Sequence, residues 1–230
     1  MSSSSRVPVV DAARGLTVLL MFGYHATWFA TDAGLASVDF RAPAWRTFQA
    51  LIAGSFLFLV GVSVTLATQA GVTTSRFVRR TARIAACGLV VTLTSVVLDP
   101  ARVVTFGILQ CITVCSLLAW GLRRSPALAA AGGSVVLWMG AIASPRFDPP
   151  WIQWVGLGTL HPATFDFQPL VPWSGLVLLG LAAGVWMPIP RATPGVLSPL
   201  VWLGQRSLFL YMAHVPVLAG GMEVLAALHR

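Results

Sequence analysis

Charge is scarce in this sequence of 230 residues: only 10% of them are charged, and none is a lysine. Water-soluble globular domains carry about 25% charged residues, so the composition excludes that class. The lack of lysine also excludes a retinal protein, because its Schiff base requires an intramembrane lysine. The three cysteines, Cys87, Cys111 and Cys115, all lie in apolar runs. Their odd number and their spacing argue against disulfide bonds and against a zinc site.

Hydrophobic residues take the place of charge: they make up 57% of the chain, and its mean hydropathy is +0.81. A helix crosses a bilayer with about 20 apolar residues, so we expect an all-α integral membrane protein, a polytopic bundle of about seven transmembrane helices. The apolar stretches are residues 9–30, 47–69, 82–98, 103–121, 126–143, 171–187 and 206–228. The rest of the sequence contains no soluble domain or internal repeat, so we expect a single transmembrane domain over residues 1–230.

The arginines predict the orientation of this bundle. The net charge of +8 comes from fifteen arginines against seven acidic residues. With seven crossings, most of the arginines fall on the side of the amino terminus, and such an excess marks the cytoplasmic side. These are Arg6, Arg14, Arg76, Arg79, Arg80, Arg83, Arg123, Arg124, Arg191 and Arg206. We therefore expect the amino terminus inside and the carboxyl terminus outside, and we attribute the basic charge to topology and not to nucleic-acid binding.

The first apolar segment, VVDAARGLTVLLMFGYHATWFA, carries the most informative polar residues. Arg14 and His25 are about three helical turns apart, so they share one stripe, roughly 16 Å apart along the axis, with Asp11. Ionisable groups are costly in hydrocarbon, and they usually face the bundle interior and mark a site. A simpler alternative is an ion pair of Asp11 with Arg14 at the membrane surface, with His25 as a hydrogen-bonded packing residue.

Another arginine cluster lies in the predicted cytoplasmic connection at residues 70–83, in the segment RFVRRTAR. Its members are Arg76, Arg79, Arg80 and Arg83, and their spacing places them on one helical face. Guanidinium groups in this arrangement suit phosphate binding. Snorkelling of the same side chains to anionic lipid explains the cluster equally simply.

Polar residues also occur in two later spans. Ser207, Tyr211 and His214 share one stripe of the last predicted helix, with Pro216 just beyond them. Gln110 offers its amide to the interior in the fourth span, although such a glutamine is about as often bonded only to a neighbouring helix.

The predicted outer loop TLHPATFDFQPLVPWSG directly precedes the sixth span. It places His161, Asp166 and Trp173 in a proline-stiffened, aromatic stretch, which suits contact with an external substrate. Alternatively, Trp173 belongs to the interfacial aromatic belt and Asp166 caps a helix.

Five blocks of the sequence are VDAARGLTVLLMFGYHATW, FLFLVGVSVTLA, VVTFGILQCITV, FDFQPLVPWSGLVLLG and LGQRSLFLYMAHVPVL. In order and spacing they resemble the bacterial homologues of heparan-alpha-glucosaminide N-acetyltransferase. The first block is also similar to the signature of the acyltransferase-3 proteins, which belong to the same transmembrane acyltransferase superfamily. The resemblance implies that an acyl group, such as acetyl, passes from cytosolic acyl-CoA through the bundle to a hydroxyl or amine of an extracytoplasmic glycan or sugar. It further implies a protein of the bacterial cytoplasmic (inner) membrane that uses acetyl-CoA as donor and needs no metal.

The same resemblance implies roles for individual residues. His25 takes the place of the catalytic histidine, and the cytoplasmic arginines would meet the CoA phosphates: Arg14, Arg76, Arg79, Arg80, Arg83 and Arg206. Read independently, His25 also suits a general base, because only histidine titrates near neutrality unperturbed. The candidates for stabilising the oxyanion are Tyr211, His214 and Gln110. The predicted contacts around the substrates are Asp11, which would orient Arg14, and His161, Asp166 and Trp173 of the outer loop.

Two other classes of protein stay open. A transporter or flippase for an anionic solute would also need arginines at one mouth and histidines in its core, but it would typically show internal repeats. A scaffold subunit would leave the clustered ionisable residues unexplained. Membrane lipid is an expected partner in every case, and the small-residue stretches at 129–133 and 178–184 would permit a homodimer.

Overall fold

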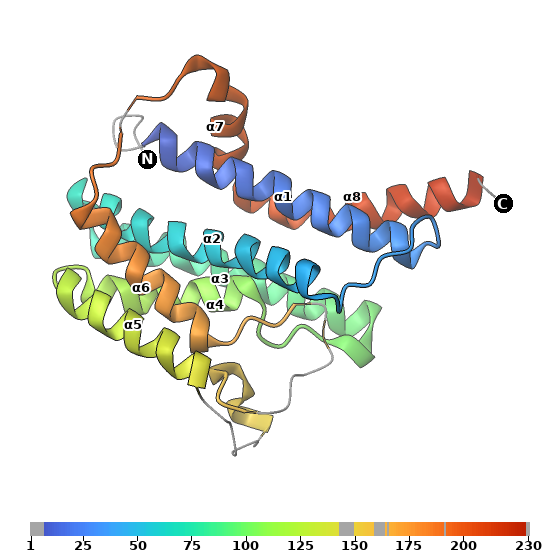
Figure 1. Cartoon of the computed structure of the whole chain (residues 1–230), viewed down its shortest axis with the longest axis horizontal. Helices are drawn as coiled ribbons and strands as arrows, with labels where there is room; N and C mark the ends of the chain where they lie inside the picture. Colours follow the sequence, from blue (N-terminus) through green and yellow to red (C-terminus); the bar gives the residue numbers. More distant parts are fainter. Residues whose placement is uncertain (1–6, 143–149, 159–163, 165, 191, 229–230) are drawn as a thin grey trace. The chain divides into compact units, whose positions relative to one another are not determined.

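The structure is a computed structural model that describes residues 7–142, 150–158, 164, 166–190 and 192–228. Within these ranges all regular secondary structure is helical (Figure 1). The helices are α1 (Pro8–Asp32), α2 (Pro43–Gln69), α3 (Thr74–Leu98), η2 (Pro100–Arg102), α4 (Ile108–Leu122), α5 (Pro126–Ile142), η3 (Pro150–Val155), α6 (Leu170–Trp186), η4 (Gly195–Leu197), α7 (Ser198–Gln205) and α8 (Ser207–Leu228). The all-α prediction is therefore confirmed for the described residues.

Each apolar stretch of the sequence overlaps one of the longer helices, α1 to α6 and α8. Three helices are long and apolar enough to cross a membrane, namely Pro43–Gln69, Thr74–Leu98 and Ser207–Leu225. Three further apolar helices, α4, α5 and α6, are 10–17 residues long. The count of seven spans and the orientation of the bundle stay predictions.

Three predicted boundaries were wrong. Residues 74–83 are the start of α3 and not part of a connection, because no proline interrupts them and arginine is a good helix former. The connection at residues 188–206 contains α7, which begins at Ser198 because Pro199 is tolerated in the first helical turn. The fourth helix begins at Ile108 instead of residue 103, with Gly107 in extended conformation at its N-cap.

The chain forms two compact units. The central unit is Leu57–Pro188, and the terminal unit combines Arg6–Phe56 with Ile189–Arg230. The boundary lies inside α2, so the first half of that helix belongs to the terminal unit and the second half to the central unit. The prediction of one functional domain over residues 1–230 stays a prediction.

In the terminal unit, α1 packs against α7 and α8 (Figure 1). Glycine makes the contact with α7 possible: a Cβ on Gly15 would lie 1.9 Å from the Leu200 carbonyl oxygen, and one on Gly204 would lie 1.8 Å from that of Asp11. The two backbones therefore touch, as small residues allow between membrane helices. The face of α1 that becomes buried includes Asp11, Val18 and Met21, so the polar stripe expected from the sequence does face inward.

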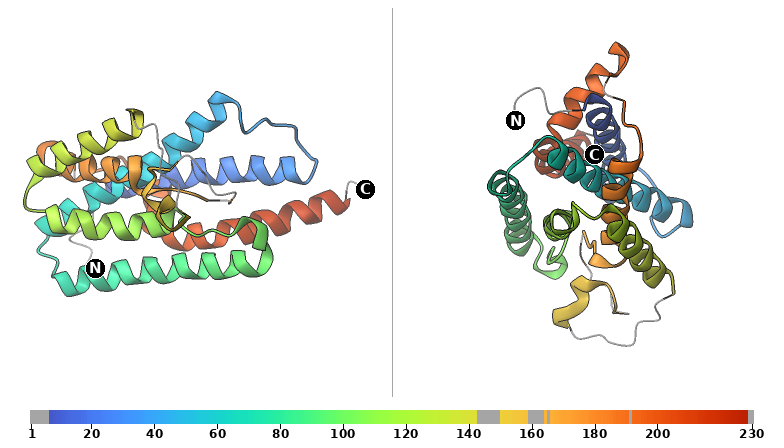
Figure 2. Two further views of the ribbon diagram at one scale, coloured as in Figure 1. Left: turned by 90° about the horizontal axis from the view of Figure 1, so that it is seen from below. Right: turned by 90° about the vertical axis from the view of Figure 1, so that its left-hand side faces the viewer.

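In the central unit, α5 packs along α6, while α4 contacts both α3 and α6 (Figure 2). The core between them contains fully buried side chains of moderate size, among them Leu57, Cys111, Val177 and Leu181. A polar side chain joins α2 to α6, because the Thr65 hydroxyl donates to the Leu181 carbonyl oxygen over 2.7 Å. The second half of α2 is thereby fixed to α6.

Candidate active site

Two histidines that are far apart in the sequence meet in the terminal unit. The ring centroids of His25, on α1, and His214, on α8, lie 4.7 Å apart, with their planes at 65°. His214 is only 2% exposed, which is rare for a polar side chain in an otherwise apolar helix. The contact joins the two polar stripes that the sequence predicted on the first and last helices.

Both histidines are held by their own helices in the same way. Nδ1 of His25 donates to the Met21 carbonyl oxygen over 3.0 Å, and Nδ1 of His214 donates to the Tyr211 carbonyl oxygen. A carbonyl oxygen can only accept a hydrogen bond, so Nδ1 carries the proton in each ring. In the neutral imidazole, Nε2 is then a lone-pair nitrogen in both residues. Nε2 of His214 is buried and has no hydrogen-bond partner among the described residues.

Aromatic side chains surround this histidine pair. Tyr24 lies 5.4 Å from the His25 ring, and Phe22 and Tyr211 lie 5.6 and 5.2 Å from the His214 ring. Phe22 and Tyr24 were missed at the sequence level, although their places within one turn of His25 on the same helix could have indicated them. Aromatic rings lower the local dielectric constant, and polar interactions between the histidines are therefore stronger than they would be in water.

The amino-terminal end of α1 carries the predicted ion pair. Nη1 of Arg14 lies 2.7 Å from Oδ1 of Asp11, and the Arg14 side chain is 18% exposed. The second carboxylate oxygen, Oδ2 of Asp11, is buried and has no hydrogen-bond partner within the described part of the chain. The ion pair therefore neutralises much of the buried charge while part of the guanidinium group stays accessible.

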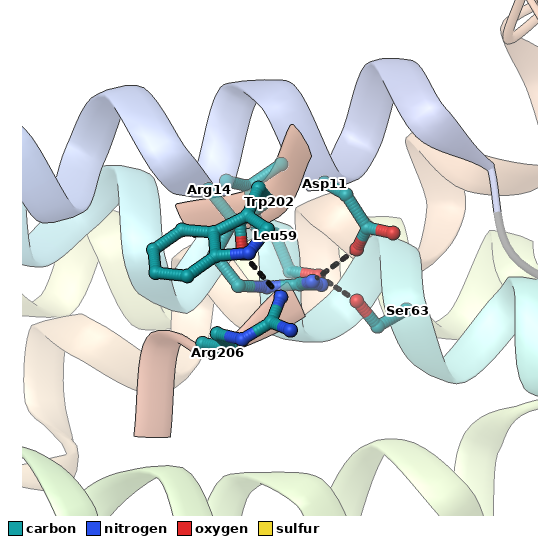
Figure 3. A network of polar contacts seen from close by, with 6 residues as sticks. All are labelled: Asp11, Arg14, Leu59, Ser63, Trp202 and Arg206. Atoms are coloured by element: carbon teal, nitrogen blue, oxygen red, sulfur yellow. Dashed lines mark hydrogen bonds and ion pairs between the residues drawn. The ribbon is translucent and has the colours of Figure 1, made fainter. Parts of the chain in front are cut away.

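Arg206 reaches this end of α1 from the junction of α7 and α8. Its guanidinium group lies 4.3 Å from the Trp202 ring centroid, and its Nη1 is 3.5 Å from the Trp202 carbonyl oxygen. In Figure 3 the side chain of Arg14 points toward Asp11, and that of Arg206 points toward Trp202. Trp202 was also missed at the sequence level, and its i, i+4 spacing to Arg206 in a short helix was the available signal.

Gln110 lies in the central unit, and its side chain forms hydrogen bonds to other residues of that unit. Its Nε2 donates to the Gly88 carbonyl oxygen over 3.1 Å and to the Thr92 hydroxyl over 2.9 Å, while its Oε1 accepts from the Gly107 backbone N–H. These bonds tie α3 to α4 and cap the start of α4. This geometry supports the alternative in which Gln110 is a hydrogen bond between helices, and its catalytic role stays a prediction.

The outer-loop residues also have contacts within the central unit. Oδ2 of Asp166 accepts the Ile108 N–H over 2.8 Å, so the carboxylate caps the amino-terminal end of α4. Trp173 packs against the apolar core. His161 lies outside the described residues. The role of these three residues in acceptor binding stays a prediction.

The arginines predicted in the connection at 70–83 occupy the first turns of α3. Arg76, Arg79, Arg80 and Arg83 are all exposed, whereas Phe77 and Thr81 between them are buried. The side chains therefore share the outer side of α3, as their spacing predicted. Within the described ranges, His, Cys, Asp and Glu do not gather in groups of three or more that could hold a metal.

Apolar helices that carry a histidine pair and a partly buried ion pair on their packed faces are typical of a membrane protein with a functional site. A model of the family "Heparan-alpha-glucosaminide N-acetyltransferase, catalytic" matches residues 6–216. The chain therefore belongs to this family, which is one of acetyltransferase-type membrane enzymes. It has no significant match among curated proteins or among solved structures.

Proposed function

We propose that this protein transfers the acetyl group of cytosolic acetyl-CoA to a hydroxyl or amine of an extracytoplasmic sugar or glycan, with His25 as the general base. The observation that supports this most is the contact of His25 with His214, in which both rings keep Nε2 as a lone-pair nitrogen. A general base must offer such a nitrogen within a site that excludes water.

In this proposal the proton moves through His25. Its Nε2 takes the proton of the acceptor O–H or N–H while the oxygen or nitrogen forms a bond to the thioester carbonyl carbon. The carbon–sulfur bond then breaks, the electron pair leaves on sulfur, and His25 returns the proton to give the free CoA thiol. A base in this position typically contributes a factor of about 10² to 10⁴ in rate.

His214 supports the charged state of His25 in this scheme. When His25 is protonated, both of its ring nitrogens are donors, and the lone pair on Nε2 of His214 is an acceptor within the same contact. This differs from the oxyanion role expected from the sequence, because a neutral ring with its proton bonded to the Tyr211 carbonyl oxygen has no second N–H to donate. Tyr211, next to His214, is the proposed oxyanion donor.

Arg14 and Arg206 are the proposed ligands of the CoA phosphates. Guanidinium groups bind phosphate through paired N–H donors. The Asp11 carboxylate holds the guanidinium group of Arg14 in place through the ion pair. Arg14 and His25 are roughly 16 Å apart along α1, which suits a donor whose thioester lies at the end of an extended arm, far from its phosphates. Asp11 acts through Arg14 and is a positioning residue.

The donor part of this proposal can be tested without knowing the acceptor. Acetyl-CoA and CoA should raise the thermal unfolding midpoint of the purified protein in detergent, and the rise should grow with ligand concentration, because only the folded state binds. ATP, which lacks the pantetheine arm, serves as the matched control for nonspecific phosphate binding. A midpoint that does not move with either CoA ligand, or that moves equally with ATP, contradicts an acetyl-CoA donor.

The acceptor can be identified in cells. Mass spectrometry of surface glycans from cells with and without the protein should show an acetyl group that depends on it. Identical glycan spectra would contradict an extracytoplasmic sugar or glycan acceptor.

A further inference from the structure

Six arginines gather at one end of the central unit. The first turns of α3 contribute Arg76, Arg79, Arg80 and Arg83, and the end of α4 contributes Arg123 and Arg124. An aromatic stack fixes these two helix ends together: the Phe77 and Trp120 rings lie 4.1 Å apart at 12°, and the Arg123 guanidinium lies 4.3 Å from the Trp120 ring centroid. We call this group of six arginines the arginine end of the central unit.

The carboxylates that the structure describes in the central unit do not lie at this end. The sequence contains no Asp or Glu from residue 40 to residue 98. The carboxylates of the central unit that the structure describes lie at the opposite ends of the same helices: Asp99 follows the last turn of α3, and Asp166 caps the first turn of α4. With 25 residues, α3 spans about 37 Å. This is several times the Debye length of about 8 Å at physiological salt, so charges at the two ends of the helix interact only weakly.

A buried donor at the arginine end has no acceptor. Trp120 is only 8% exposed, and its indole Nε1–H has no hydrogen-bond partner among the described residues. Guanidinium and indole groups can donate but cannot accept. The side chains of this end therefore form a set of donors, and a ligand with acceptor oxygens and negative charge, such as phosphate, complements it.

The outer side of α3 continues from these arginines into apolar residues. Arg76, Arg83, Val90 and Val97 follow one another at seven-residue spacing and so share one stripe of the helix. Val90 and Val97 are 51% and 78% exposed, and Leu93 on the same helix is 56% exposed. A phospholipid carries phosphate at one end and acyl chains at the other, in the same order as this stripe, whereas the soluble nucleotide end of CoA has no apolar chain to cover it.

We propose that the arginine end of the central unit is a binding site for anionic phospholipid. The phosphate of the head group lies among the guanidinium groups, beside the Phe77–Trp120–Arg123 stack, and the acyl chains cover the apolar stripe of α3. From the sequence alone, both anionic lipid and CoA were possible ligands of the α3 arginines. The charge separation and the apolar continuation of the stripe favour lipid, and the proposal is independent of acetyl transfer.

The experiment measures lipid binding to the purified full-length protein by native mass spectrometry, with phosphatidylglycerol compared with phosphatidylcholine. The wild type should bind phosphatidylglycerol more tightly, and the double variant Arg76→Gln/Arg83→Gln should weaken this binding by about 30-fold, at roughly a fivefold effect per arginine. The double variant Arg41→Gln/Arg46→Gln removes the same charge from the terminal unit and should leave the affinity within about twofold of wild type, because such surface substitutions cost little. Trp120→Phe keeps the ring and removes the N–H, and it should weaken binding about threefold.

Equal affinity for the two lipids, or equal losses in the two double variants, would overturn the proposal. CoA serves as a separate arm of the same experiment. If CoA binds the wild type and Arg76→Gln/Arg83→Gln abolishes this binding, the arginine end belongs to the donor site and the lipid proposal is wrong. Unchanged affinity for phosphatidylglycerol in Trp120→Phe would show that the indole N–H does not bind the lipid.

Discussion

Gln110 and Asp166 in the central unit use their polar groups differently from His214 and Asp11 in the terminal unit. In the central unit, Gln110 bonds to two neighbouring groups on α3 and to its own helix start, and Asp166 caps α4. In the terminal unit, His214 and Asp11 each keep a buried side-chain atom without a hydrogen-bond partner among the described residues, as Trp120 and Gln168 do in the central unit. A polar residue in an apolar helix is equally conspicuous in both units. Polar atoms without a hydrogen-bond partner distinguish a site that can bind or react from a site that holds helices together.

The largest effect that this comparison predicts is at His214. Replacement by Ala should lower the rate of acetyl transfer by about 100-fold, because protonated His25 loses its acceptor, while CoA affinity should stay unchanged. His214→Gln keeps an acceptor oxygen on a side chain of similar reach and should retain more activity than Ala. The measurement is the rate of CoA release together with CoA affinity by calorimetry. Added imidazole should partly restore the Ala variant, and a structural defect alone would not respond to it.

At the other end of α1, neutralising an arginine should weaken donor binding. Arg14→Gln and Arg206→Gln should each cost about 1.5–3 kcal/mol in CoA affinity, as is typical of hydrogen bonds to charged groups. The loss should shrink in high salt for the exposed Arg206. Arg46→Gln, an exposed arginine at the start of α2, is the matched control. If calorimetry shows the same CoA affinity in all three variants, the terminal unit does not hold the phosphates.

A change at Gln110 should affect the fold and not the chemistry. Gln110→Leu removes bonds between α3 and α4 and leaves their partners unsatisfied, so thermal unfolding should show a loss of about 1–3 kcal/mol. Turnover of the protein that remains folded should change little. If turnover instead falls by the factor of about 10² to 10³ that accompanies loss of an oxyanion donor, Gln110 belongs to the active site and the distinction between the units fails.

The smallest effect is expected at Asp166, where two substitutions separate the possible roles. Asp166→Ala should destabilise the protein by about 0.5–2 kcal/mol through loss of the α4 cap, whereas Asn caps nearly as well and should cost little. If Asp166 binds the acceptor through its charge, both variants should instead raise the acceptor concentration needed for half-maximal rate. Thermal unfolding and transfer kinetics of the two variants decide between these outcomes.

The helices were the part of the fold that the sequence predicted well. Apolar length located the long helices, because burial in lipid or protein requires long apolar segments. It could not find α7, which has eight residues and whose role depends on the contact of Gly204 with the Asp11 backbone. It also started α3 too late, because hydropathy ends a segment at the first arginines although arginine continues a helix readily.

For the candidate site, helical periodicity predicted each stripe but not which stripes meet. The positions of Asp11, Arg14 and His25 on one inward face follow from their spacing alone. The contact of His25 with His214 depends on the packing of α1 against α8, a long-range arrangement that spacing within one helix does not contain. Likewise, the caps formed by Gln110 and Asp166 became visible only when their partners, from elsewhere in the chain, were in place.

The role of His25 as the general base is tested by comparing wild-type protein with His25→Ala in cells that otherwise lack the protein. Mass spectrometry would quantify the acetyl groups on surface glycans, and calorimetry on the two purified proteins would give their CoA affinities. Thr27→Ala, a substitution two residues away on the same helix that removes only a hydroxyl bonded to the Gly23 carbonyl oxygen, is the control. Acetylation should fall by about 10²-fold or more in His25→Ala, with CoA affinity unchanged and with Thr27→Ala like wild type. Wild-type acetylation by His25→Ala would contradict this role.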